Sequence, residues 1–180
     1  IVGSLAGYRQ MFRGEPGMLW LDAHGDFNTP GTTPSGFIGG MCLAFVCGRG
    51  PKFSAEVEAS RPLLKEEKLV HLGSRDLDPS ESKAMEASPM RLYSSKRVHE
   101  DGVVKVADQV ANFLSGAADW IICHLDLDVI DPGTMPAVNY PTQAGLTTQE
   151  VRSIIEAVKN TGKLKVFDLA AYNPSLDPNR

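Results

Sequence analysis

Short apolar runs alternate with longer amphipathic stretches along the chain. Four of the apolar runs are typical of buried strands, and they cover residues 18–21, 68–72, 120–125 and 164–167. Runs of this kind suit parallel strands that are covered by helices on both faces. Since amphipathic stretches separate them, we expect right-handed crossovers and an α/β protein, a three-layer α/β/α sandwich with a mainly parallel sheet.

The expected helices lie between these strands. Residues 2–12 and 39–48 are predicted to be helical, and apolar residues recur at close to helical spacing from 103 to 114. Thr147 and Glu150 have the spacing of a capping box. The helix that follows it presents one apolar face, formed by Val151, Ile154, Ile155 and Val158.

Two loops rich in proline and glycine, residues 27–36 and 130–145, each follow a predicted strand. In open parallel sheets, sites form beside the carboxyl ends of strands, where such loops gather. The chain of 180 residues is long enough for one domain and has no internal repeat, so we treat residues 1–180 as a single domain. Because Ile1 opens a predicted helix without a preceding Met, we expect the N-terminal portion of the domain to be missing.

The composition narrows the class of protein. Hydrophobic residues make up 42% of the chain and charged residues 22%, which is ordinary for a soluble globular protein. A net charge of -4 argues against a nucleic-acid partner, and no apolar run reaches the length of a membrane span. Cys42, Cys47 and Cys123 form no CxxC pair, and no signal peptide is evident. We therefore expect reduced thiols and a cytoplasmic location.

Acidic motifs follow two of the predicted strands. One motif runs from Asp22 through His24 to Asp26, and the other contains Asp126 and Asp128. Residues two apart in an extended chain point to the same face, so the side chains of each motif can converge. Carboxylates crowded in this way repel one another unless divalent cations neutralise them. Oxygen-rich ligation with one imidazole suits manganese better than zinc, so the motifs predict a manganese site.

Other interpretations of these residues remain open. An isolated Asp-x-Asp at a strand end most often caps a turn, although two such motifs beside Gly/Pro loops favour metal binding. His124 lies on the same side of its strand as Asp126, so it either orients that ligand from the second shell or is a core histidine bonded to backbone. Asp131 precedes Pro132 and is predicted to organise the turn and, behind the metal ligands, to help hold them in place.

The same motifs resemble those of the ureohydrolase superfamily of arginases, agmatinases and formiminoglutamases. Residues 22–26 are similar to its DAHxD motif, and residues 124–132 to its SxDxDxxDP motif, with His124 in place of Ser. Further similar segments occur in the same order as in the family: residues 28–30, 33–36, 73–79, 168–169 and 173–174. The resemblance spans nearly the whole chain and implies the arginase-like α/β/α fold.

The resemblance also implies a ligand set. One metal would take Asp22, Asp26 and Asp126 with a His from a motif upstream of Ile1, and the second would take Asp22, His24, Asp126 and Asp128. Two Mn²⁺ ions per subunit are expected if the upstream ligand exists.

The family further implies the roles of single residues and the state of assembly. His24, Asp26 and Asp126 would be catalytic, while Asn28 and Ser35 would contact a small-molecule substrate. A homotrimer or homohexamer is expected.

Three positions depart from the family pattern. Ala171 occupies the place of a guanidinium-binding Glu, Gly39 that of a His, and Phe37 that of an Asn. Efficient arginase or agmatinase activity is therefore not expected. We expect a manganese-dependent hydrolase that cleaves a C–N bond of a guanidino, amidino or related linear amidine substrate by metal-bound hydroxide. The alternative is a non-catalytic protein of this fold that binds a metal or metabolite or acts as a regulatory subunit.

Two further classes find little support in the sequence. No glycine-rich nucleotide-binding motif follows a strand, and no cluster of Lys and Arg is present to bind the phosphate of a phosphoester.

Arg75 and Asp76 are interpreted either as a buried ion pair near the site or as an intersubunit or loop-holding pair.

Overall fold

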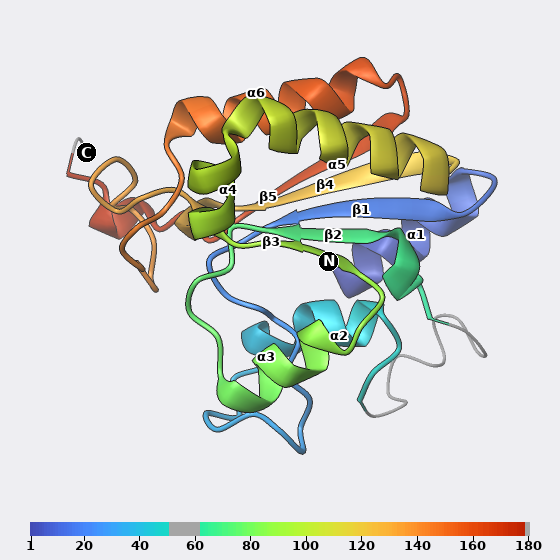
Figure 1. Ribbon diagram of the computed structural model, residues 1–180. Coiled ribbons are helices and arrows are strands. Elements are labelled where there is room, and N and C mark those ends of the chain that lie inside the picture. Colours follow the sequence, from blue (N-terminus) through green and yellow to red (C-terminus); the bar gives the residue numbers. More distant parts are fainter. Residues whose placement is uncertain (51–61, 179–180) are drawn as a thin grey trace.

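The protein contains one parallel sheet of five strands in the order β3-β2-β1-β4-β5, as a computed structural model of residues 1–50 and 62–178 shows (Figure 1). The strands are β1 (Pro16–Leu21), β2 (Leu69–Leu72), β3 (Arg91–Tyr93), β4 (Trp120–Asp126) and β5 (Leu164–Ala170). Every neighbouring pair is parallel. The four strands predicted from apolar runs are confirmed, whereas the short edge strand β3 was not predicted.

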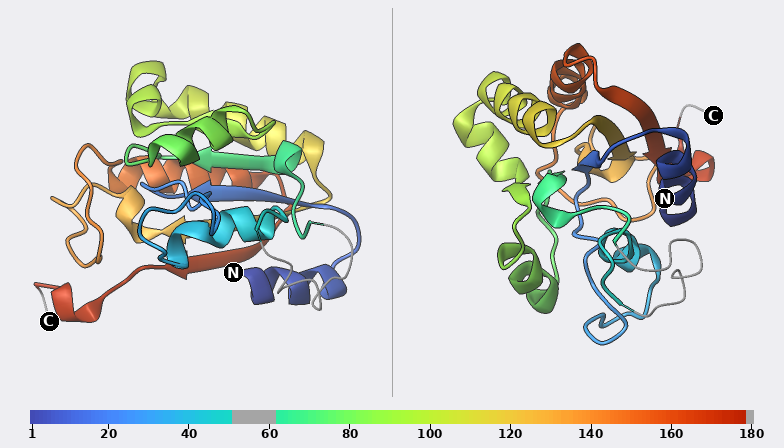
Figure 2. Two further views of the ribbon diagram at one scale, coloured as in Figure 1. Left: turned by 90° about the horizontal axis from the view of Figure 1, so that it is seen from below. Right: turned by 90° about the vertical axis from the view of Figure 1, so that its right-hand side faces the viewer.

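Helices cover both faces of the sheet. One layer contains α1 (Val2–Met11), α2 (Cys42–Val46) and α3 (Pro79–Glu86), and the other contains α4 (Ser95–Asp101), α5 (Val103–Ala117) and α6 (Thr148–Asn160), as both views show (Figures 1 and 2). Each layer packs on its own buried hydrophobic cluster. The predicted three-layer α/β/α sandwich is thus confirmed. Short 3-10 turns occupy Gly39–Met41, Glu66–Lys68, Leu127–Val129 and Pro174–Leu176.

Local sequence explains most of the helix boundaries. Thr147 and Glu150 form the predicted capping box, in which the Thr147 hydroxyl accepts a hydrogen bond from the Glu150 amide, and α6 begins directly after it. The predicted helix over residues 39–48 is only partly correct. Gly39 and Gly40 disfavour a regular helix, so a 3-10 turn precedes the five residues of α2.

The strand order places a topological switch point between β1 and β4. The chain adds β2 and β3 on one side of β1 and then crosses over to add β4 and β5 on the other. Trp20 pairs with His124 and Leu21 with Leu125, so the two acidic motifs leave the sheet side by side. Ligands of open α/β sheets bind at such a crevice beside the carboxyl ends of strands.

None of the described helices combines the length and the apolar character that a membrane span requires. All three cysteines are free thiols, as expected from their number and spacing.

Candidate metal centre

The first acidic motif begins one residue beyond β1. The Asp22 side chain is buried, and hydrogen bonds fix both of its oxygens. Oδ2 accepts from the Trp20 indole Nε1 at 3.0 Å, and Oδ1 accepts from the His24 backbone amide at 2.7 Å. This carboxylate is therefore held in one orientation at the carboxyl end of the central strand.

Asp26 reaches the site by a turn and not by the alternation of an extended strand. The strand ends at Leu21, and Asp26 has a left-handed backbone with φ of 48°, which is uncommon for a residue other than glycine. The prediction that extended spacing brings the side chain of Asp26 to the site was therefore wrong, whereas Asp22 and His24 do lie together as predicted. Such sparsely populated conformations concentrate at functional sites, where surrounding structure holds them in place.

Glu81 in α3 supports that turn from behind. Its Oε1 accepts a hydrogen bond from the Phe27 amide at 2.8 Å. A Cβ at Gly25 would lie 2.5 Å from the Glu81 Cδ, so only glycine allows this approach. The small residues of the first motif were predicted to permit close neighbours, and Gly25 does so.

The second acidic motif is a short turn after β4. Asp126 is the last residue of the strand, and its Oδ1 accepts from the Asp128 amide at 3.0 Å across the 3-10 turn Leu127–Val129. Asp128 Oδ1 in turn accepts from the Ala23 amide at 3.1 Å. This last bond joins the two motifs directly, across 105 residues of sequence.

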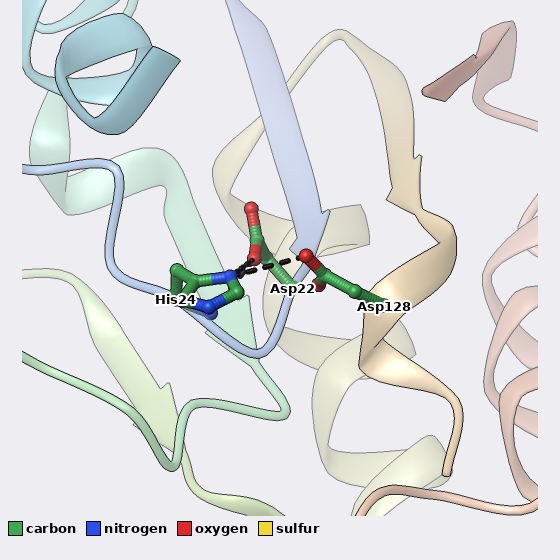
Figure 3. Close-up of side chains that lie close together, drawn as sticks. All are labelled: Asp22, His24 and Asp128. Atoms are coloured by element: carbon green, nitrogen blue, oxygen red, sulfur yellow. Dashed lines mark hydrogen bonds and ion pairs between the residues drawn. The ribbon is translucent and has the colours of Figure 1, made fainter. Parts of the chain in front are cut away.

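The ligand atoms of Asp22, His24 and Asp128 converge on one point (Figure 3). His24 Nδ1 lies 3.1 Å from Asp128 Oδ2 and 3.5 Å from Asp22 Oδ1. One ligand atom from each of the three residues lies within 4.8 Å of the others, which suits a single cation. Asp26 and Asp126 lie outside this closest group but line the same pocket.

The electrostatics of the cluster show why it needs positive charge. Burial, followed by repulsion from Asp128, raises the pKa of Asp22 to about 6. Burial, followed by repulsion from Asp22 and Asp128, raises the pKa of Asp126 to about 8. The pKa of Asp26 rises well above its usual range, because the side chain is buried and lies near Asp22 and Asp126. Without cations these carboxyl groups cannot all be ionised at neutral pH.

His24 takes the place of a cation in this arrangement. Burial alone lowers its pKa, but hydrogen bonds to Asp128 and Asp22 outweigh burial and raise the pKa to about 11. Burial acts to raise the pKa of Asp128, but the hydrogen bond with His24 and the charge of His24 help to lower this pKa below its usual range. A metal ion that displaced the proton of His24 would find the imidazole of His24 and the carboxylates of Asp22 and Asp128 already close together. These three residues therefore fit a divalent cation.

The His124 side chain interacts with Asp168, whereas we expected it to interact either with Asp126 or with a backbone group. Its Nδ1 lies 2.8 Å from Asp168 Oδ2 on the neighbouring strand β5, and its ring stacks on Trp20 with centroids 3.9 Å apart. The expectation of a backbone-bonded core histidine is therefore wrong. Through Trp20, which donates to Asp22, His124 packs behind the cluster, and it also lines the pocket.

Asp131 organises its own loop. Its carboxylate accepts hydrogen bonds from the amides of Gly133 and Gly145 at 3.0 and 3.1 Å. It is not among the residues that line the pocket. The turn-organising role follows from these contacts, whereas a second-shell role toward the metal cluster has no support in them.

Arg75 also braces the loop after β4. Its guanidinium donates to the carbonyl oxygens of Asp128 at 2.7 Å and Thr142 at 2.9 Å. Within the described residues the hydrogen bonds of its guanidinium go to carbonyl oxygens and not to Asp76, which favours the loop-holding interpretation over a buried ion pair.

The pocket above the cluster has a volume of about 810 Å³. Asn28 and Ser35, the two predicted substrate contacts, both line it. Asn28 is buried and donates from Nδ2 to Asp78 Oδ2 at 2.9 Å, whereas Ser35 is exposed. The three residues at positions that depart from the family pattern line the same pocket: Phe37, Gly39 and Ala171.

Among the pocket residues that sequence reasoning did not assign to the site are Asp78, Glu81 and Tyr140. The first two could have been found, because Asp78 and Glu81 have capping-box spacing with Pro79 between them, and they do cap α3. Tyr140 carried no such signal, since it lies in an irregular loop rich in proline.

The fold and the site together define a class, an α/β protein with an acidic candidate metal pocket at the switch point of a parallel sheet. A family model described as the arginase family matches residues 1–180. The chain belongs to the arginase family.

Individual relatives agree with this assignment. The chain is 35% identical over 176 residues to an arginase of Bacillus subtilis (strain 168), covering 98% of this chain and 59% of the relative. It is 36% identical over 183 residues to a non-hepatic arginase of Xenopus laevis, covering 97% of this chain and 49% of the relative. The chain thus spans about half to three fifths of the length of these relatives.

Solved structures show the same fold. A crystal structure of the arginase from Bacillus subtilis matches with a TM-score of 0.91 at 35% identity, covering 98% of this chain and 61% of that chain. The formimidoylglutamase from Bacillus subtilis matches with a TM-score of 0.77 at 17% identity, covering 98% of this chain and 50% of that chain, which shows the fold alone.

Proposed function

We propose that the protein is a manganese-dependent hydrolase that cleaves a C–N bond of a small guanidino or amidino substrate. The observation that carries this proposal is the convergence of Asp22, His24 and Asp128 within 4.8 Å at the bottom of a pocket. Membership of the arginase family supports a hydrolytic role for such a centre. Oxygen ligands with one imidazole favour manganese over zinc.

The ligands would be Asp22, His24, Asp26, Asp126 and Asp128. When bound, the metal ions would lower the pKa of the attacking water and polarise the substrate. The protein supplies the fixed geometry, because hydrogen bonds from Trp20 and His24 hold Asp22 and the Ala23 amide holds Asp128.

The catalytic residues would be His24, Asp26 and Asp126. Asp26 is buried beside the other carboxylates and lines the pocket, so its carboxylate would accept the proton of the attacking water. As the substrate carbon becomes tetrahedral, negative charge develops on the oxygen that attacks it. His24 and Asp126 would balance the charges around that oxygen.

Two residues that line the pocket, Ala171 and Gly39, support the proposal that the substrate is neither arginine nor agmatine. Ala171 lines the pocket with only a methyl group, so at this position no carboxylate can form a charge-assisted pair with a guanidinium. Gly39 offers no side chain for proton transfer. We propose that turnover of arginine and agmatine is inefficient for this reason.

Steady-state kinetics with added Mn²⁺ test the proposal. A panel of guanidino, amidino and formimino compounds should contain at least one substrate that is hydrolysed only with metal present, while arginine and agmatine are poor substrates. Robust turnover of arginine or agmatine would refute the specificity. Absence of any hydrolysis, with Mn²⁺ bound, would favour the non-catalytic metal-binding or regulatory alternative, which Ala171 and Gly39 motivate.

The cytoplasmic location and the homotrimer or homohexamer remain predictions. Light scattering after gel filtration of the purified protein measures the oligomer directly, and a monomer would contradict the expectation.

A further inference from the structure

Two aromatic side chains form the outer wall of the pocket. Phe37 and Tyr140 are 51% and 58% exposed, yet their rings lie 5.7 Å apart, tilted by 49°. Tyr140 also meets the His24 ring edge-on, with centroids 6.3 Å apart. The aromatic pair, Phe37 with Tyr140, therefore begins next to the candidate metal ligand and ends in solvent.

Gly39 is the residue that lets Phe37 occupy this place. A Cβ at position 39 would lie 2.3 Å from Phe37 Cε1 and 2.7 Å from Phe37 Cζ, closer than van der Waals contact allows. The ring of residue 37 thus fills the space in which a side chain of residue 39 would begin. The departures from the family pattern at positions 37 and 39 therefore depend on each other, because the Phe37 ring needs the space that Gly39 leaves free.

The loops that carry the aromatic pair are tied down. The Phe37 amide donates to Ser35 Oγ at 3.2 Å. Asn139, which precedes Tyr140, accepts from Asn173 Nδ2 at 2.7 Å. A wall held in this way can offer a preformed apolar surface to a ligand.

The charges of the pocket restrict what that ligand can carry. Among the described residues that line the pocket, the charged side chains include no Lys or Arg, and the carboxylates are those of Asp22, Asp26, Asp76, Asp78, Glu81, Asp126, Asp128 and Asp168. The basic side chain of His24 is already paired with Asp128 and Asp22, so a ligand with its own carboxylate would find no Lys or Arg to pair with in this lining. A ligand with a cationic head and an uncharged hydrocarbon end matches both parts of the pocket.

We propose that the substrates are guanidines or amidines with a single positive charge and an aryl or alkyl substituent, which packs against Phe37 and Tyr140. This inference rests on the proposed hydrolase function. For a substituted guanidinium, water adds to the central carbon and the bond from that carbon to the substituted nitrogen breaks. Both protons of the water go to the departing nitrogen, so one substituted ammonium ion and one urea form.

The experiment compares benzylguanidine, butylguanidine, agmatine and arginine with the Mn²⁺-loaded protein. We expect benzylguanidine and butylguanidine to have the highest kcat/KM. Phe37→Ala should raise the KM for benzylguanidine about tenfold with little change in kcat, because it removes an aromatic contact and leaves the metal ligands in place. Phe37→Tyr, which keeps the ring, should restore the KM.

Two further variants connect the effect to the aromatic pair. Gly39→Ala should raise the same KM by displacing the Phe37 ring. Ile38→Ala is the matched control, because Ile38 is 63% exposed in the same loop and is not among the residues that line the pocket. Its KM should equal that of the unmodified protein.

Specific outcomes would overturn the inference. Preference for agmatine would indicate that the rings bind a second cation, and equal KM values in Phe37→Ala and Ile38→Ala would remove the aromatic contact from recognition. If no compound is hydrolysed, titration calorimetry with benzylguanidine separates the two proposals. Binding that weakens in Phe37→Ala would count against the hydrolase and retain the recognition of substituted guanidines by the aromatic pair, whereas absent binding would overturn that recognition as well.

Discussion

The inner and outer ends of the pocket are built in opposite ways. At the inner end, Asp22 and Asp128 are buried and accept hydrogen bonds from the indole of Trp20 and from backbone amides of the turn. At the outer end, Phe37 and Tyr140 are more than half exposed and make mainly ring contacts. The fold thus fixes the position of the charges. By our proposal, the choice of substrate depends on the surface loops, which can change at little cost to stability.

His24 lies where the two ends meet. Its Nδ1 contacts Asp128 at 3.1 Å, and the edge of its ring meets Tyr140. A substitution at the inner end should therefore affect metal binding and all substrates alike, whereas one at the outer end should affect some substrates and not others.

The largest effect is expected for Asp128→Asn. The substitution keeps the size of the side chain but removes the charge that faces His24 and, by our proposal, the metal. Loss of even an outer contact to a ligand typically weakens metal binding 10–100-fold, so we expect a loss of about 100-fold or more in Mn²⁺ affinity and in kcat for every substrate. Calorimetric titration with Mn²⁺ and steady-state kinetics measure both quantities.

Asp108→Asn is the control for charge alone. Asp108 is exposed on α5, so Mn²⁺ affinity should be unchanged in this variant. Comparable Mn²⁺ affinity in Asp128→Asn and the unmodified protein would contradict the assignment of the metal centre.

The second prediction concerns pH and metal removal. The pKa of Asp22 is raised to about 6 and that of Asp126 to about 8 by burial and by neighbouring carboxylates. In the metal-free protein the folded state therefore binds protons more tightly than the unfolded chain does. The resulting stability is fully present below pH ~4 and is lost as pH rises through about 6 and 8.

Manganese should reverse this trend, because it binds the deprotonated carboxylates. We expect the increase in Tm on adding Mn²⁺ to grow from about pH 5 to about pH 8, with roughly 2–4 °C for each kcal/mol gained. Thermal unfolding with EDTA and with Mn²⁺ at several pH values measures the difference. An Mn²⁺ effect on Tm that is constant over this range would argue against the acidic cluster as the binding site.

Much of the inner end could be predicted from the sequence. The positions of the acidic motifs after apolar runs placed Asp22 and Asp126 at adjacent strand ends, and the sheet confirms that placement. Local patterns were sufficient because burial on both faces leaves apolar runs in parallel strands, and because the crossover rule fixes where their carboxyl ends meet.

The remaining parts depend on contacts that no local pattern encodes. The left-handed turn at Asp26 is held by Glu81, which is 55 residues further along the chain, and the bond from Ala23 to Asp128 spans 105. β3 has only three residues and is too short to give a clear period. Tyr140 reaches the pocket through an irregular loop whose course is set by tertiary contacts.

A third prediction tests how tightly the inner end is supported. Gly25→Ala places a Cβ 2.5 Å from the Glu81 Cδ, so the turn or α3 must move. We expect a loss of about 1–3 kcal/mol in the free energy of unfolding and weaker Mn²⁺ binding. Urea denaturation of the metal-free protein and Mn²⁺ titration measure these effects.

Gly116→Ala is the matched control for this prediction. Apart from the backbone of α5 itself, no described residue lies within 4 Å of a Cβ at Gly116, so this variant should gain about 0.5–1 kcal/mol from the higher helix propensity of alanine. Equal stability of Gly25→Ala and the unmodified protein would mean that Glu81 does not support the turn.

The smallest effect on stability is expected at the outer end, for Ser35→Ala. Ser35 is exposed, and within the described part of the chain its Oγ accepts a single backbone hydrogen bond, from the Phe37 amide at 3.2 Å. The free energy of unfolding should therefore change by less than about 0.5 kcal/mol. The KM of substrates should nevertheless shift by a few-fold, because the hydroxyl lines the pocket and orients the backbone of Phe37. Mn²⁺ affinity should stay constant, since no ligand of the inner end contacts this hydroxyl within the described hydrogen bonds. A variant with weakened Mn²⁺ binding would show that the two ends of the pocket are coupled, and the division of roles between them would then be wrong.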